Sequence, residues 1–517
     1  MKIAPNEPRN VLMVNTFQTG GGAGRVAQTL AERLRHAGLG VEAFVKGNPA
    51  DDPCCHRVSH WRVAAIEEWL QAHGLPELGD LTSFAWRCRA EYATADILHL
   101  HNLHGAYLSL AALPLWGWDK PIVWTLHDHW PLTGNCATPR DCGRWQHACG
   151  HCPLLGVYPM SRIDRSRFYR WLKPRLFAAA RPRIVTPSEW LAARVRRVPQ
   201  LRHLPITVIR NPIDTEVFAP RDGQRALREQ FALKPDHPTI VMAGANWGDR
   251  FKGANHALQA LRVARAKVPT LQLLAIGGQS NGLLAASGLP GRALPFLEGR
   301  TSLAEAYSAA DLCLFPSRAE NYPATTLEAL ACETPVVAYS VGGIPEQVRH
   351  DVCGYVARDG RPDELAAGII ALATHPEHAR RMGRHGREFV LRTSALDVTT
   401  RRYREEYRRA FRDWCRRRDR NTPRIRSGRV ARCVAEFLGW PSIGPTRAPS
   451  LNTSRFVPDM DQRATMTTLR ATPPTCECGL TPQRRRPGES TTGPARPPCS
   501  CDPTHAAVRD AGSGGDR

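Results

Sequence analysis

A repeated alternation of apolar runs and helical patterns constrains the fold more than any other feature of this 517-residue sequence. Short aliphatic runs, such as RNVLMVNTF (9–17), are followed by loops and then by segments with apolar residues at helical spacing, such as VAQTLAERLRHAGL (26–39). Strands that alternate with helices form parallel sheets, because each helix carries the chain back to the same end of the sheet. The sequence therefore predicts an α/β protein with helices on both faces of a parallel sheet.

The alternation occurs in two successive series. After RNPIDTEVFAP (210–220) the pattern restarts, and the second series resembles the first in length. Two such series predict two similar Rossmann-like domains with a cleft between them, and ligands of such sheets bind beyond the carboxyl ends of the strands. From about residue 421 the chain is rich in Pro, Ser, Thr, Arg and Gly without periodicity, which predicts disorder. We expect four parts: a domain at 1–209 with a Cys-rich insertion at 131–153, a domain at 210–392, an Arg-rich closing helix at 393–420 and a disordered basic tail at 421–517.

The net charge of +22 is concentrated near the end of the chain. Residues 401–420 and residues 421–517 each carry an excess of six positive charges. This pattern predicts either a solvated helix face and tail or attraction to an anionic membrane surface. No nucleic acid is expected as a partner, because no aromatic-interleaved motif accompanies the charge. Without a long apolar run or a signal-like N-terminus, we expect a cytoplasmic protein, with peripheral attachment to the inner face of the cell membrane as the alternative.

The stretch AENYPATTLEALACETPVVA (319–338) places two carboxylates around the start of a predicted helix. Glu320 lies in the loop before that helix, and Glu328 lies within it, with seven residues between them. Pro323 suits the first turn of a helix, whose free N–H groups form an anion pocket. A sugar nucleotide would place its diphosphate against those N–H groups and its hydroxyls against the carboxylates. The alternative is two surface acids at a helix start, where negative charge is favoured in any case.

The longer segment PSRAENYPATTLEALACETPVVAYSVGGIPEQV (316–348) resembles the donor-site signature of retaining GT-B glycosyltransferases of family 4, which contains an E-x7-E motif. The chain departs from that signature at Glu333, where the family usually has Gly. The resemblance covers roughly residues 9–415. The matching positions are Pro316, Ser317, Glu320, Pro323, Glu328, Ala329, Thr334, Pro335, Gly342, Gly343 and Glu346.

The resemblance implies roles for individual residues of the donor site. Glu328 would bind the ribose hydroxyls of the donor, and Glu320 would face the transferred sugar or the diphosphate. Lys252 and Arg250, in the loop GDRFKG, would neutralise the diphosphate, with Arg250 the weaker match in spacing. Backbone N–H groups around the donor-binding segment would touch the sugar and the phosphates, and the residues of that segment are Asn321, Tyr322, Pro323, Ala324 and Thr325.

Two segments of the first predicted domain complete the expected site. The glycine loop TGGGAGR lacks the lysine of a P-loop and could be a plain tight turn. Its resemblance to the family's first loop implies that Gly21 and Gly22 let backbone approach the donor phosphate and the acceptor. The strand-end sequence TLHDHW places His127 where the family has a histidine that contacts the transferred sugar, although a histidine there could equally be a satisfied structural group.

Four cysteines follow at C-x5-C-x6-C-x2-C spacing. Four thiols within so short a segment can form a closed tetrahedral zinc site, with a structural rather than catalytic role. The alternatives are four reduced thiols or a redox pair at the last two positions. The run TLHDHWPLTGNC and the cysteines after it resemble exopolysaccharide glycosyltransferases, including colanic-acid-type enzymes. The cysteines are Cys136, Cys142, Cys149 and Cys152.

These expectations combine into one functional hypothesis. The resemblance implies a retaining glycosyltransferase that moves a hexose from a GDP- or UDP-sugar to a saccharide acceptor, with a lipid-linked acceptor favoured. It implies no metal or other cofactor for catalysis, and His127 and Glu320 as catalytic residues. The alternatives are a sugar-nucleotide epimerase on the same fold, which would act without an acceptor, and a non-catalytic binding protein.

Overall fold

The computed structural model describes residues 7–16, 21–47, 52–58, 64–159, 162–249, 251–297 and 299–420. Arg250 and the tail expected to be disordered, residues 421–517, lie outside the described residues. In the part of the chain that is described, no helix is both long enough and apolar enough to cross a membrane.

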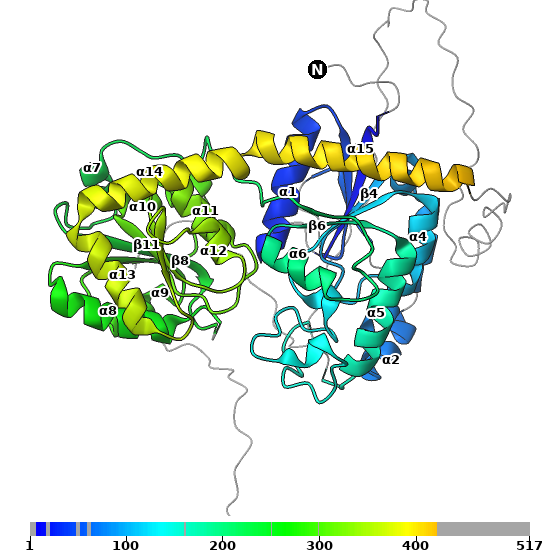
Figure 1. Ribbon diagram of the computed structural model, residues 1–517, viewed down its shortest axis with the longest axis horizontal. Coiled ribbons are helices and arrows are strands. Elements are labelled where there is room, and N and C mark those ends of the chain that lie inside the picture. The colour runs from blue at the N-terminus through cyan, green and yellow to red at the C-terminus, as the bar shows by residue number, and fades with distance from the viewer. Residues whose placement is uncertain are drawn as a thin grey trace, which may run out of the picture. The chain divides into compact units, whose positions relative to one another are not determined.

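The N-terminal half forms a seven-stranded parallel sheet in the order β3-β2-β1-β4-β5-β6-β7 (Figure 1). Its central strands are the apolar runs of the sequence, and β1 pairs with both β2 and β4, with Val11 opposite Val41 on one side and Ile97 on the other. The strands are β1 (Asn10–Asn15), β2 (Gly40–Val45), β3 (Cys55–Arg57), β4 (Ile97–Leu100), β5 (Ile122–Thr125), β6 (Arg183–Thr186) and β7 (Ile206–Val208).

Helices cover both faces of this sheet and bury an aromatic core against it. Trp86 and Trp116 stack with ring centroids 5.2 Å apart, and Trp124 packs edge-on against Phe177 of α5 at 4.5 Å. The helices are α1 (Gly21–His36), α2 (Ala64–Ala72), α3 (Ala90–Thr94), α4 (Leu113–Asp119), α5 (Ser166–Ala180) and α6 (Glu189–Arg196). The 3-10 turns are η2 (Pro76–Leu78), η3 (Leu81–Cys88), η4 (Leu110–Ala112), η5 (Trp130–Leu132) and η6 (Gly143–Gln146).

The second sheet has six parallel strands in the order β10-β9-β8-β11-β12-β13 and repeats the architecture of the first. Its strands are β8 (Thr239–Asn246), β9 (Gln272–Gly278), β10 (Gly291–Leu294), β11 (Leu312–Phe315), β12 (Val336–Tyr339) and β13 (Gly354–Ala357). Its helices are α7 (Gln224–Gln230), α8 (Ala254–Lys267), α9 (Ser280–Ser287), α10 (Arg300–Ala309), α11 (Ala324–Ala331), α12 (Ile344–Gln347), α13 (Pro362–Thr374) and α14 (Pro376–Thr393). The predicted α/β class with two parallel-sheet domains is therefore confirmed.

The last described helix, α15 (Leu396–Arg420), packs against the first sheet rather than the second. Tyr403 and Tyr407 are buried in the cluster that contains Val11, and their hydroxyl groups bond to Thr125 and His99 at 3.1 and 2.8 Å. Burial of these aromatic faces explains why a helix so rich in arginine is ordered at all.

Each sheet reverses its strand order between two central strands, β1 and β4 in the first sheet and β8 and β11 in the second. The loops that follow such a pair diverge to opposite sides, which leaves room for a ligand at the carboxyl end of the sheet. The glycine loop follows β1, the loop with Lys252 follows β8, and the loop with Glu320 follows β11. The fold therefore places the predicted residues at the positions where α/β proteins bind ligands.

Candidate active site

Glu320 forms the centre of a hydrogen-bonded cluster in the loop between β11 and α11. Lys252 Nζ and Ser317 Oγ both donate to Glu320 Oε1, each at 2.8 Å. The neighbouring carboxylate raises the pKa of Lys252, so this ammonium group stays charged at neutral pH. The loops after β8 and β11 thus bring a fixed positive charge to the start of α11.

The start of α11 has the free N–H groups of an anion site. Pro323 has the extended backbone of a cap residue (φ −64°, ψ 141°), so it precedes the helix, whereas the sequence placed it in the first turn. The first helical N–H groups have no acceptor within the helix, and the dipole adds positive potential there. Ala324 and Thr325 are only partly buried, so this end of the helix is accessible to a ligand.

Glu328 lies one turn further along α11 and is nearly buried, with 7% of its surface exposed. Tyr307, in α10, donates its hydroxyl to Glu328 Oε2 at 3.3 Å. Burial raises the pKa of the Glu328 carboxyl, and the nearby Arg25, Tyr307 and Arg300 partly offset this effect. A carboxylate held in this way can accept hydrogen bonds from a pair of ligand hydroxyls.

Two glycines pack the neighbouring loops so closely that no side chain would fit. Gly253 has φ +73°, and a Cβ there would lie 2.0 Å from the carbonyl oxygen of Pro316. Gly342 has φ +61°, and its Cβ would lie 1.9 Å from the carbonyl oxygen of Glu320. The Lys-Gly and Gly-Gly pairs of the sequence are therefore needed to hold the Glu320 loop between two other loops.

Asn321 joins this loop to the N-terminal sheet. Its Nδ2 donates to the carbonyl oxygen of His127 at 3.0 Å, and its Oδ1 accepts from Ser188 Oγ at 2.8 Å. The next carbonyl, that of Tyr322, accepts from Asn211 Nδ2 at 2.7 Å. Ser188 and Asn211 were not singled out from the sequence, because these contacts join positions more than a hundred residues apart.

His127 lies at the carboxyl end of β5 and bonds to a second histidine. The distance from His127 Nε2 to His101 Nδ1 is 3.0 Å, and the two rings are nearly parallel. Burial lowers the pKa of His127 to about 4 and holds the pKa of His101 well below its usual value, so both rings are neutral at pH 7.

The bond between the two rings assigns their protons. His101 Nε2 is buried and has no hydrogen-bond partner among the described residues. A proton on that nitrogen would be a buried unpaired donor, which is costly. The favoured arrangement therefore has the proton of His101 on Nδ1, donated to His127 Nε2, so that His127 carries its own proton on Nδ1, ready to donate to a ligand.

Gly21 and Gly22 form the first turn of α1, where the sequence suggested a loop. A Cβ at either position would meet no described atom within 4 Å, so packing does not require glycine there, although the φ of +66° at Gly21 favours it. Arg25, one turn further, stacks over Phe296 at 5.1 Å and contributes to the electrostatic environment of Glu328. Arg25 could not be singled out from the sequence, because nothing in this glycine-rich stretch distinguishes it from a solvated basic residue.

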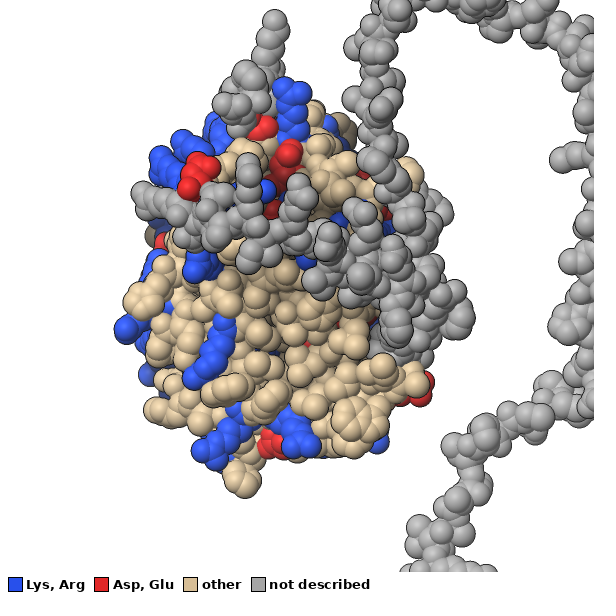
Figure 2. Space-filling view, turned by 90° about the vertical axis from the view of Figure 1, so that its right-hand side faces the viewer, with Lys and Arg blue, Asp and Glu red and all other residues tan. Residues whose placement is uncertain are grey.

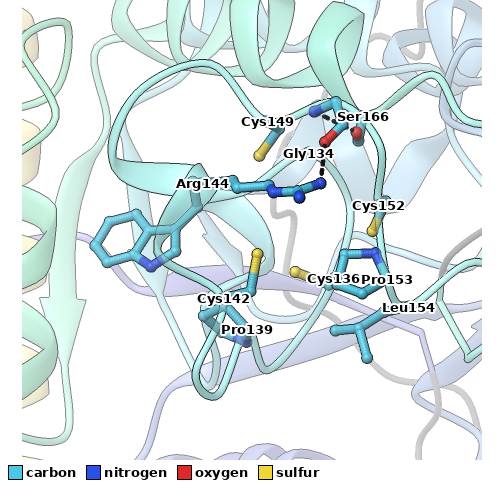
Figure 3. Close-up of a pocket in the computed structure, with 12 residues that line it drawn as sticks. Gly134, Cys136, Pro139, Cys142, Arg144, Cys149, Cys152, Pro153, Leu154 and Ser166 are labelled. Atoms are coloured by element: carbon cyan, nitrogen blue, oxygen red, sulfur yellow. Dashed lines mark hydrogen bonds between the residues drawn. The ribbon is translucent and has the colours of Figure 1, made fainter.

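The cysteines of the predicted zinc cluster line one pocket in the loop between η5 and α5 (Figure 3). As they stand, no three His, Cys, Asp or Glu side chains of the described chain are close enough together to hold a metal ion. The structure thus brings Cys136, Cys142, Cys149 and Cys152 to one place without forming a coordination sphere.

Comparison with known proteins identifies the family. The model described as "Glycosyltransferase Family 4" matches residues 20–217, and the model described as "Glycosyl transferases group 1" matches residues 223–389. The chain belongs to the family 4 glycosyltransferases of the GT-B fold, and it is a glycosyltransferase. This membership favours a transferase over the epimerase and binding-protein alternatives.

Relatives and a solved structure support the assignment. The D-inositol 3-phosphate glycosyltransferase of Mycobacterium marinum (strain ATCC BAA-535 / M) is 27% identical over 405 residues, covering 74% of this chain and 80% of that protein. WcaC of Escherichia coli (strain K12), whose name places it in colanic acid biosynthesis, is 27% identical over 348 residues, covering 64% and 82%. HepE of Anabaena, solved in complex with UDP, has the same fold, with a TM-score of 0.54 at 16% identity over 77% of this chain and 99% of that one.

Proposed function

We propose that the chain transfers a hexose from a GDP- or UDP-sugar, with retention of configuration, and that the loops after β8 and β11 bind the donor. The observation that carries this proposal is the cluster of Lys252, Glu320 and Ser317 at the free N-terminus of α11, with buried Glu328 one turn beyond. The ammonium group and the helix N–H groups suit a diphosphate, and the Glu328 carboxylate suits a ribose. The UDP bound to HepE supports a nucleoside diphosphate as the ligand of this fold.

Each residue then has a role in the reaction. Lys252 and the backbone N–H groups around Pro323, up to those of Ala324 and Thr325, stabilise the charge that develops on the departing diphosphate, which lowers the barrier to breaking the glycosidic bond. Glu320 orients Lys252 and accepts from a hydroxyl of the sugar. His127 donates its Nδ1 proton to another sugar hydroxyl, and its neutrality keeps it from attracting the diphosphate in place of Lys252.

The geometry favours front-face attack by the acceptor. Glu320 Oε1 accepts from Lys252 and Ser317, so the charge of this carboxylate is paired with the ammonium group, which makes Glu320 a weak nucleophile toward the sugar. The acceptor hydroxyl would lose its proton to the departing phosphate on the same face, so configuration is retained. No metal or other cofactor takes part in this scheme, since Lys252 and the helix dipole supply the positive potential.

For the acceptor we propose a saccharide carried on a lipid, presented at an anionic membrane. Trp118 of α4 and Trp171 of α5 are 60% and 53% exposed, and Trp414 of α15 donates its indole N–H to the carbonyl oxygen of Trp118 at 3.2 Å. Arg175 and Arg418 lie over Trp171 and Trp414 at 4.8 and 5.0 Å. Figure 2 looks onto this side of the molecule and shows mostly uncharged residues with Lys and Arg scattered among them. Exposed tryptophans beside arginines are typical of membrane-surface anchors.

Nucleotide-induced thermal stabilisation tests the donor assignment. A ligand that binds only the folded state raises its stability with the logarithm of ligand concentration over Kd. Selective stabilisation by GDP or by UDP, with little effect of ADP or CMP, would identify the base of the donor. Loss of that stabilisation in Glu328→Ala would place the nucleotide at α11. If none of the four nucleotides shifts the melting temperature, the donor site proposed here is wrong.

A further inference from the structure

The loop between η5 and α5 has little regular structure to hold it. In the described part of residues 133–165 the only helical turn is η6, and Trp145 is the main buried side chain, with 5% exposed. Of the ten non-glycine residues with positive φ in the described part of the chain, four fall here: Asn135, Arg140, Cys149 and His151. Such conformations cost about 1 kcal/mol or more each and persist only when the surroundings impose them. Something beyond local propensity must therefore fix this loop.

The thiols of this loop share one pocket of about 310 Å³, part of it open to solvent, which is also lined by Arg144 and Ser166. Figure 3 shows all four cysteines around that space, with the Arg144 side chain crossing it. The loop itself is tied to α5: Gly150 N donates to Ser166 Oγ at 2.9 Å, and Cys152 N donates to Asp164 Oδ2 at 2.8 Å. These two bonds hold the backbone of the cysteine loop against the start of α5, and metal binding would require the sulfurs to move closer together than they stand.

Two buried basic side chains lie beside the pocket. Within the described residues, Lys173 Nζ donates to the carbonyl of Trp130 at 2.6 Å and to Asn135 Oδ1 at 3.1 Å, and Arg170 Nε–H donates to the carbonyl of Trp145 at 2.7 Å. Burial lowers the pKa of Lys173 to about 7, and the carboxylates of Glu77 and Asp128 oppose this effect. An anionic centre at the pocket would add to that attraction and offset the cost of burying the two basic groups.

We propose that Cys136, Cys142, Cys149 and Cys152 bind one zinc ion that closes the loop following His127. On binding, each thiol loses its proton to solvent, and the four thiolates outweigh the divalent cation in charge. The centre is therefore anionic, and Lys173, Arg170 and Arg144 balance it. Because all four positions are filled by protein ligands, the zinc ion is structural and leaves no place for substrate.

A redox pair at Cys149 and Cys152 is the alternative. All four cysteines of the pocket are free thiols in the structure, so no disulfide supports that role.

The first experiment measures metal in the full chain purified without chelator. We expect zinc to approach one ion per chain by plasma mass spectrometry, and Cys149→Ser and Cys152→Ser to lose it. Cys415→Ser, which removes a partly exposed thiol of α15 outside the cluster, is the matched control and should keep the metal.

A second experiment covers variants that fail to fold. Removing zinc from the wild type with a strong chelator should lower the melting temperature, and added zinc should restore it. Cobalt added to the metal-free chain should give the visible bands of a tetrahedral thiolate site. A wild type that is folded and metal-free, whose melting temperature does not respond to zinc, would overturn the proposal, as would disulfides among the four cysteines by mass spectrometry. The donor site at α11 is tested separately, by thermal stabilisation with GDP and UDP. A failed zinc test therefore does not bear on the proposed donor site.

Discussion

Replacing Glu328 by glutamine should change nucleotide binding and stability in opposite directions. If the carboxylate accepts from two ribose hydroxyls, the amide turns two charge-assisted hydrogen bonds into neutral ones. A charged bond contributes about 1.5–3 kcal/mol and a neutral one about 0.5–1.5 kcal/mol, so the loss is about 1 kcal/mol per bond. Two bonds give about 2 kcal/mol, which is about a 30-fold increase in Kd for the preferred nucleoside diphosphate.

The stability of the ligand-free protein should move the other way. Burial raises the folded pKa of Glu328 above its usual value of 4.5, so the folded state binds this proton more tightly than the unfolded state. The ionised carboxylate therefore lowers stability as pH rises through the window from 4.5 to the folded pKa, and the cost remains at higher pH. Glu328→Gln removes that cost, so the variant should melt higher than the wild type at neutral pH, and this advantage should vanish below pH 4.5.

Thermal melts with and without nucleotide measure both effects in one series. Glu229→Gln, which neutralises an exposed carboxylate on α7 of the same sheet domain, is the matched control and should change neither Kd nor melting temperature appreciably. Unchanged nucleotide affinity in Glu328→Gln would refute the ribose role. A ligand-free variant that melts lower than the wild type at neutral pH would refute the argument from burial.

Three other changes test separate features. Glu333 has φ +61° just after α11, so Glu333→Gly should raise the free energy of unfolding by about 1 kcal/mol in denaturant titrations. Glu333→Ala keeps the strained backbone and should show no such gain. Equal stability of the two variants would contradict the argument from backbone strain. Burial lowers the pKa values of three histidines, to about 3 for His99, about 4 for His127 and about 3 for His129, so below pH 6.5 the unfolded chain binds protons that the folded chain does not. The stability contributed by the neutral rings should therefore be complete above pH 6.5 and fall as pH drops from 6.5 toward 4. A melting temperature that stays constant over this range would be inconsistent with neutral buried rings. The double change Trp118→Ser and Trp171→Ser should lower binding to anionic liposomes about tenfold or more in sedimentation assays, whereas Trp69→Ser, an exposed tryptophan on α2, should not; equal losses in both would argue against a membrane surface at α4 and α5.

The sequence predicted the central strands and the edge strand β7, but not the edge strands β3 and β10. β1, β8 and β11 are apolar runs buried on both faces, and that composition is visible without any structure. β3 and β10 are edge strands of three and four residues, too short to show a periodicity. Their order is imposed by pairing with β2 and β9 rather than by their own composition.

The residues of the candidate site also differ in whether local sequence or long-range contacts determine them. Glu320 and Glu328 could be predicted because one contiguous motif contains both, and Lys252 because the short loop GDRFKG resembles a loop of the same family. The partners that position them could not: Tyr307 reaches Glu328 from another helix, and Asn321 bonds to the backbone of His127 across 194 residues. Such contacts depend on how the strands are ordered in each sheet, which local patterns do not encode.

The packing of α15 on the first sheet has a consequence for how the protein is synthesised. Tyr403 and Tyr407 fill the core beside β1 and bond to Thr125 and His99, so the domain that begins the chain lacks part of its interior until more than 400 residues have been made. The second sheet, by contrast, is complete once α14 has emerged. On the ribosome the C-terminal domain therefore gains its full set of contacts before the N-terminal one, and an N-terminal fragment released early would expose an unfilled apolar groove to chaperones and proteases.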